Sequence, residues 1–166
     1  MTVTVEDLSL LERRRLEAMV LVPVIRAMQA RFGEAEVNEV VAGAIRGIAT
    51  EQGEGRPRVA TPVELGAAIG GRKAMLGHES TIQDGSLTIE VVAADAEQFA
   101  FDVKHCRFVE MYDELGASDL GFILSCNRDA AGFAAMAPDL TFERTQTRMQ
   151  GADHCDFRFR NSHLAS

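Results

Sequence analysis

The chain has 166 residues, of which 46% are hydrophobic and 25% are charged, a composition that predicts one globular domain with a buried core and argues against disorder. The net charge of −8 argues against nucleic acid and anionic membranes as partners, and no apolar run reaches the length of about 18 residues that a membrane-spanning helix needs. We therefore expect a small-molecule substrate as the partner, and the composition leaves a homo-oligomer open.

The N-terminal part of the chain is predicted to be helical. Apolar residues at helical spacing predict helices over 7–32 and 35–49, and Pro23 should kink or split the first of them. A capping signal, Thr61-Pro62-Val63-Glu64, opens a third helix that we expect to cover residues 61–76.

The pattern then changes to the alternation that is typical of half-buried antiparallel strands. Four such segments cover residues 87–93, 99–103, 140–149 and 155–159. On the second of these strands, the alternation places His105 on the same face as the apolar side chains. Between the two strand pairs, helical spacing returns over 108–115 and again from Ser118, and residues 125–129 form a predicted corner.

These elements together predict an α+β fold. N-terminal helices pack on an antiparallel sheet of about four strands, and further helices are inserted between two hairpins. The prediction is a single domain over residues 1–166. Residues 1–78 form its helical half, and residues 79–166 form a hairpin, helix and hairpin half that carries the candidate site.

The number of cysteines bears on the cellular compartment. Cys106, Cys126 and Cys155 are too few, and odd in number, for a disulfide framework. The arginines at 13–15 and the apolar residues after them resemble a signal peptide, but acidic residues precede them and no small-residue cleavage site follows. We therefore predict a reducing, cytoplasmic location.

Residues able to carry chemistry gather at the junctions between predicted elements. They are His105 and Cys106 after a strand, Cys126 and Asp129 at the corner, and His154 and Cys155 before the last strand. Cys106 is expected at a helix N-terminus, where the helix dipole and free backbone N–H groups favour a thiolate. Pairing of the two hairpins in one sheet is expected to bring these junctions together.

Two alternatives stay open for the cysteines. Cys155 lies on an apolar strand face, where packing in the core explains it equally well. The spacing of a structural zinc site, C-x2-C, is not present, but a scattered site in which Cys106, Cys126 and Cys155 bind a metal remains an alternative.

Five segments between residues 98 and 160 carry a resemblance to a known family. They are Lys104-His105-Cys106-Arg107-Phe108, Glu114-Leu115-Gly116, Cys126-Asn127-Arg128-Asp129, Glu143-Arg144-Thr145-Gln146-Thr147 and Gly151-Ala152-Asp153-His154-Cys155-Asp156-Phe157-Arg158-Phe159. In these segments the chain resembles the L-2-amino-thiazoline-4-carboxylic acid hydrolases, and the last segment is the most specific. The closing strand is also distantly similar to small-molecule sensor domains of the vinyl-reductase type.

The resemblance to the hydrolases implies ring-opening hydrolysis of a cyclic, amidine-like C=N group of the thiazoline type. Water adds to the ring carbon, a C–S or C–N bond breaks, and no cofactor is implied. For this chemistry we assign Cys106 as the thiolate nucleophile, or as the residue that positions the attacking water. We assign His105 or His154 as the general acid/base.

The remaining roles concern substrate binding. Asp129 orients the base or holds the amino group of the substrate, and Cys126 and Cys155 complete the pocket wall. Arg144 or Arg107 binds a substrate carboxylate, ideally in bidentate geometry. The competing hypotheses are a sensor domain that uses the same pocket without turnover and a metal-binding protein with three cysteine ligands.

Overall fold

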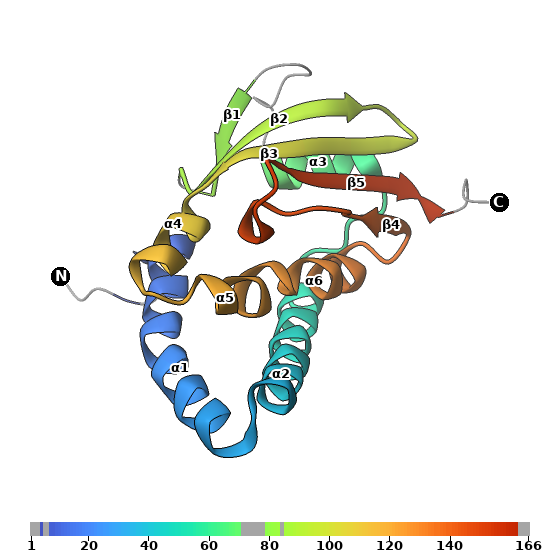
Figure 1. Cartoon of the computed structure of the whole chain (residues 1–166). Coiled ribbons are helices and arrows are strands. Elements are labelled where there is room, and N and C mark those ends of the chain that lie inside the picture. The colour runs from blue at the N-terminus through green and yellow to red at the C-terminus, as the bar shows by residue number, and fades with distance from the viewer. Residues whose placement is uncertain (1–3, 5–6, 71–78, 84, 163–166) are drawn as a thin grey trace.

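The molecule is built on a five-stranded antiparallel sheet with the strand order β1-β2-β3-β5-β4 (Figure 1). The computed structural model describes residues 4, 7–70, 79–83 and 85–162. The strands are β1 (Glu79–Ile82), β2 (Leu87–Ala94), β3 (Gln98–Cys106), β4 (Leu140–Glu143) and β5 (Cys155–Asn161). The predicted α+β fold is confirmed, with β1 as a strand that the sequence patterns did not predict.

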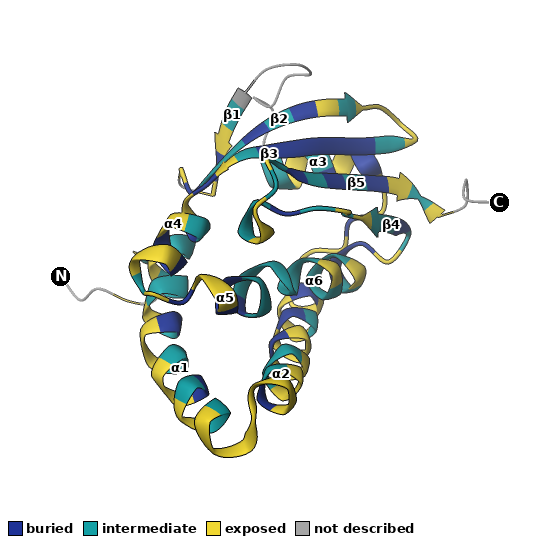
Figure 2. Ribbon diagram, viewed as in Figure 1, coloured by how far each residue is buried: buried dark blue, intermediate teal, exposed yellow. Residues whose placement is uncertain are grey.

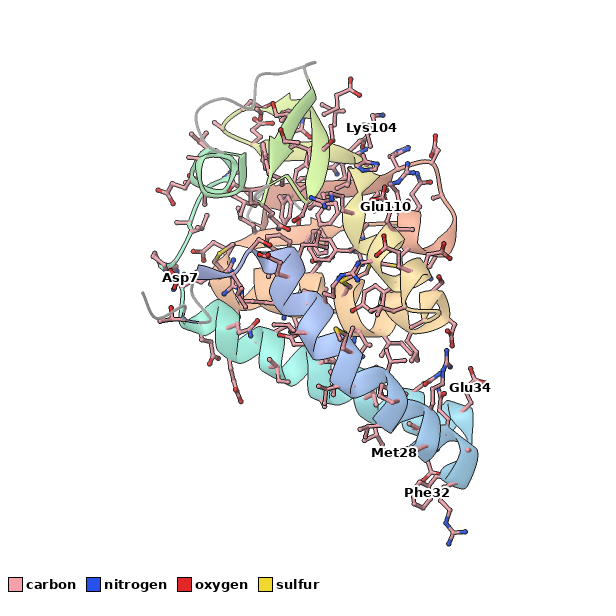
Figure 3. All side chains as sticks on the ribbon, turned by 90° about the vertical axis from the view of Figure 1, so that its left-hand side faces the viewer. Asp7, Met28, Phe32, Glu34, Lys104 and Glu110 are labelled. Carbon is pink, nitrogen blue, oxygen red and sulfur yellow. The ribbon has the colours of Figure 1, made fainter. Side chains whose placement is uncertain are left out.

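A layer of helices lies below the sheet in Figure 1, where α1 and α2 form a hairpin and α5 and α6 lie between this hairpin and the strands. The helices are α1 (Leu10–Phe32), α2 (Glu34–Glu54), α3 (Pro62–Gly70), α4 (Arg107–Glu114), α5 (Ser118–Gly121), the π-helix η3 (Phe122–Cys126), α6 (Arg128–Met136) and the 3₁₀ helix η4 (Arg148–Gln150). Met28, Phe32 and Glu34 mark the tip of the α1–α2 hairpin in Figure 3. None of the described helices is long and apolar enough to cross a membrane.

Helix α1 shows that the expected effect of Pro23 was wrong in one respect, because the helix is not split. A capping box between Ser9 and Glu12 starts it, and Gly33 ends it with a φ of 97°. Pro23 removes the N–H group that would bond to the carbonyl of Met19. Both residues lie on the exposed face of the helix, where water can satisfy that carbonyl, so the helix continues.

Two other predicted elements differ in extent. The predicted strand over 140–149 ends at Glu143, because the backbone N–H groups of Thr145 and Gln146 donate to the carboxylate of Asp156 instead of to a strand ladder. Helix α3 agrees with the predicted start, since the side chain of Thr61 accepts from the N–H group of Glu64. The predicted continuation of that helix over 71–76 lies outside the described residues.

A β-bulge near the end of β3 decides which side chains face the helices. Ile89 pairs with Val103 and Thr88 pairs with His105, so Lys104 is an extra residue on β3. An extra residue exchanges the faces of all residues that follow it. The prediction that His105 shares a face with the apolar side chains was therefore wrong: His105 is exposed, and Cys106 is buried with Val103.

The predicted corner over 125–129 was also wrong, because the chain stays helical there. Helix α5 passes into η3, in which the N–H group of Asn127 donates to the carbonyl of Phe122 at 2.8 Å, and α6 follows. This i to i+5 bond is the pattern of a π-helix, which is often found at functional sites. The continuous helical path places Cys126 and Asp129 one turn apart.

The core lies between the sheet and the helices. Figure 2 shows β3 as a largely buried central strand, whereas the tip of the α1–α2 hairpin is exposed. Phenylalanines of β3 and β5 stack across the strand pair, and the rings of Phe101 and Phe157 are 4.7 Å apart at 12°. On the helical side, Met111 and Tyr112 of α4 are buried against this core.

Candidate functional site

A cavity of about 490 Å³ lies between the inner face of the sheet and the helices. Its wall comes from α1, α2, α3, β1, β2, β3, α4, η3, α6 and β5 and from segments between them, so both halves of the chain contribute to it. The volume is within the range of small-molecule sites. Apolar side chains such as Phe101, Phe133, Met136 and Phe157 form much of the wall, and a few polar groups converge on it.

Five of the eight residues predicted for the site meet in this cavity. They are Cys106, Cys126, Asp129, Arg144 and Cys155. They come from β3, η3, α6, the segment after β4, and β5. The expectation that these distant junctions converge is thus met by the sulfur and carboxylate groups.

The other three predicted residues lie outside the cavity wall. Exposed His105 pairs with Glu110 at 3.2 Å, and both Lys104 and Glu110 lie near the junction of β3 and α4 in Figure 3. His154 pairs with Asp153 at 2.7 Å and precedes Cys155, so the alternation of β5 turns it away from the face that Cys155 lines. Arg107 is exposed. The expectation that His105 and His154 join this site was therefore wrong, and no described histidine lines the cavity.

The carboxylate of Asp129 is the most strongly perturbed acid of the site. It lies in the wall of the cavity and forms an ion pair with Arg144, and 31% of its side-chain surface is accessible. Burial raises its pKa to about 6, although the charge and hydrogen bond of Arg144 act in the opposite direction. Only Oδ2 is used in this pair, and Oδ1 accepts no hydrogen bond from the described residues. Asp129 is therefore an acid that titrates near neutral pH with one oxygen available to a ligand.

Arg144 is held rigidly by its surroundings. One Nη donates to Asp129, and the other donates to the carbonyl of Cys126 at 3.1 Å. The guanidinium carbon also lies 5.3 Å from the ring centre of Phe157, and the rings of Phe122 and Phe142 are within 5.9 Å, distances that are typical of cation–π contacts. These contacts make Arg144 a support for Asp129.

The three thiols are in their neutral form at neutral pH. Burial raises the pKa of each of them. For Cys106, at the N-cap of α4, the N–H groups of Phe108 and Val109 lower the pKa but do not outweigh burial. The helix N-terminus thus favours a thiolate as expected, but burial has the larger effect and the net shift is upward. Cys155 accepts a hydrogen bond from the N–H group of Arg148 at 3.2 Å, and its pKa is still raised to about 11.

Three arginines of the cavity wall were not among the predicted site residues. They are Arg14 of α1, Arg56 after α2, and Arg128 of α6. Arg14 belongs to the arginine run at 13–15, and Arg128 lies between Cys126 and Asp129. These neighbourhoods were visible in the sequence, but only the fold shows that α1 reaches the site.

Within the described part of the chain, no group of three or more His, Cys, Asp or Glu side chains is arranged to hold a metal ion. The three cysteines thus share a cavity without forming a ligand set of that kind.

Among curated proteins, no significant match to the chain is found. A family match extends over residues 13–159, which include all the residues that line the cavity except Leu10. The chain therefore belongs to the L-2-amino-thiazoline-4-carboxylic acid hydrolase family.

Proposed function

We propose that the protein is a hydrolase that opens a small cyclic, amidine-like ring of the thiazoline type, with Asp129 as its general base. The observation that carries this proposal is the carboxylate of Asp129 in the cavity, with a pKa of about 6 and a free oxygen. A general base works best when its pKa is near the working pH. The membership of a family named for a thiazoline hydrolase supports the same reaction class.

The reaction balances with this single base. Asp129 removes a proton from a water molecule as the water oxygen bonds to the C=N carbon of the ring. The electron pair of the C=N double bond moves to the ring nitrogen. When this pair re-forms the double bond, the C–S bond breaks, its electron pair goes to sulfur, and protonated Asp129 returns the proton to that sulfur. The second proton of the water molecule then moves from oxygen to the former ring nitrogen, which converts the isourea to the urea. For 2-amino-thiazoline-4-carboxylate the product is N-carbamoyl-cysteine.

The neutral thiols suit a supporting role better than a nucleophilic one. A thiol is a weak hydrogen-bonding group, and only its thiolate is a strong nucleophile. Because burial raises the pKa of Cys106, we assign this residue to positioning the attacking water. Cys126 and Cys155 complete the wall, and Arg144 keeps the carboxylate of Asp129 in place.

The test is incubation of the purified protein with L-2-amino-thiazoline-4-carboxylate, simple 2-amino-thiazoline and related lactams, followed by mass spectrometry of the small molecules. From the thiazolines we expect a product heavier by one water molecule that carries a free thiol. The Asp129→Asn variant should give no product, whereas Asp119→Asn, which changes an exposed carboxylate on α5, should behave as the wild type. Binding of these rings without any product would overturn the hydrolase and favour the sensor hypothesis.

A further inference from the structure

We propose that Arg14 and Arg128 form the subsite that binds the carboxylate of the substrate, and that this pair makes the cavity selective for ring acids. The inference rests on the proposed function for the identity of the ring. The first observation behind it is the charge of the wall. Among the described residues that line the cavity, four are arginines and one, Asp129, is a carboxylate, although the whole chain carries a net charge of −8. Such a wall favours an anionic ligand.

Arg14 and Arg128 share one acidic partner. Both side chains are largely buried, with 12% and 10% of their surfaces accessible. Glu17 accepts hydrogen bonds from Arg14 at 2.7 Å and from Arg128 at 3.1 Å, and it is itself 40% exposed. One carboxylate thus faces two guanidinium groups, so this cluster keeps an excess positive charge next to the cavity.

The hydrogen bonding of Arg128 is also incomplete. Its Nε donates to the carbonyl of Leu124 at 2.9 Å and its Nη2 donates to Glu17, but its buried Nη1 has no partner. An unsatisfied buried donor is unfavourable. Burial and the neighbouring charge of Arg14 lower the pKa of Arg128. An anion bound beside these two arginines would accept a hydrogen bond from the unpaired Nη1 and would stabilise the positive charge of Arg128.

The other arginines of the wall are less suited to this role. Arg144 is already matched by Asp129 and enclosed by aromatic rings. Arg56 is exposed, where a charge pair with a ligand is screened by water.

The position of the pair relative to Asp129 fits a small bifunctional ring. Arg128 and Asp129 are consecutive residues in the first turn of α6, and both line the cavity. Arg14 and Arg128 are also close enough to Asp129 to lower the pKa of its carboxyl group. A ring with an amidine at one end and a carboxylate at the other can therefore meet Asp129 and the arginine pair at the same time.

The test uses binding of thiazole-4-carboxylate, an aromatic ring that is not hydrolysed, compared with thiazole, which lacks the carboxylate. In calorimetric titrations, wild-type protein should bind the acid more tightly than thiazole. Arg14→Met and Arg128→Met should each weaken binding of the acid about ten- to hundredfold and leave thiazole binding unchanged. Arg15→Met is the matched control, because Arg15 lies on the same helix and pairs with exposed Glu114.

Several outcomes would overturn the subsite. These are equal affinities of wild-type protein for the two rings, an equal loss for both rings in the variants, or the same loss in Arg15→Met. If Arg128→Met does not fold, Arg128→Lys keeps the charge but not the forked geometry, and a selective loss for the acid is then expected from it and from Arg14→Met.

The result is independent of turnover. Selective binding of the acid without any thiazoline hydrolysis would remove the proposed function and keep the subsite. Hydrolysis of the thiazoline with no preference for binding the acid would keep the proposed function and remove the subsite.

Discussion

Replacing Asp129 by Asn should lower turnover sharply and make the protein more stable at neutral pH. The amide has the shape of the protonated acid, and its oxygen can still accept the hydrogen bond of Arg144. The pKa of Asp129 is raised from 3.8 to about 6, which corresponds to an unfavourable free energy of about 3 kcal/mol for the ionised form in the folded protein. Because water in the cavity reaches part of the side chain, we expect a gain of about 1–3 kcal/mol in the free energy of unfolding.

The sign of this effect depends on pH. Between about pH 4 and pH 6 the folded protein binds more protons at Asp129 than the unfolded chain does, so the wild type loses stability as pH rises through this interval. Asn does not titrate. The variant should therefore be as stable as the wild type near pH 4 and more stable above about pH 6. The kcat/KM of the wild type should rise over the same interval, as Asp129 becomes ionised and able to act as a base.

Urea denaturation of both proteins at pH 4.0 and pH 7.5, together with steady-state kinetics, tests this reasoning. Loss of turnover by a factor of about 10²–10⁴ is expected from removal of a general base. Asp119→Asn is a control of opposite sign, because the pairing of exposed Asp119 with Arg26 lowers the pKa of Asp119, and its loss should destabilise the protein slightly. An Asp129→Asn variant that is less stable than the wild type at pH 7.5 would show that the ionised carboxylate has a structural role.

Three further predictions concern the thiols, helix packing and metals. Cys106→Ser should fold and keep part of the turnover, since the raised pKa of Cys106 argues against a thiolate in the resting enzyme; complete loss of turnover in a folded variant would restore the nucleophile. Gly53→Ala should lower the free energy of unfolding by about 1–3 kcal/mol, because a Cβ would lie 2.5 Å from the carbonyl oxygen of Gly132 on α6, whereas Gly47→Ala, with open space around it, should stabilise the protein by about 0.5–1 kcal/mol in the same urea titrations. Elemental analysis of protein purified without chelators should find no stoichiometric zinc or iron, and one equivalent that is needed for turnover would instead support the three-cysteine metal site.

Much of the fold was predictable because burial imposes simple periods on the sequence. The stripe of α2 and the alternation of β2, β3 and β5 each reflect contact with one core, and each gave the correct element. The patterns gave wrong predictions where a few hydrogen bonds determine the backbone conformation. The side chain of Asp156 takes the N–H groups that would extend β4, and a π-helical turn replaces the corner before α6.

The same limit applies to the site. Cys106, Cys126 and Asp129 were predicted to converge from their positions at element junctions, and they line one cavity. Their protonation could not be predicted, because burial depends on elements far away in the sequence. For the same reason Arg14 was missed, since only packing of α1 against the rest of the chain brings it to the cavity wall.

The bulge at Lys104 determines which functional group the end of β3 presents to the cavity. One residue inserted into β2 opposite Lys104 would remove the bulge, and it would turn the imidazole of His105 toward the cavity and the thiol of Cys106 toward solvent, while Phe101 and Val103 kept their places. Insertions and deletions at a single strand end can therefore exchange the functional group offered to a ligand, and relatives with different chemistry can arise without any change in the frame that holds it.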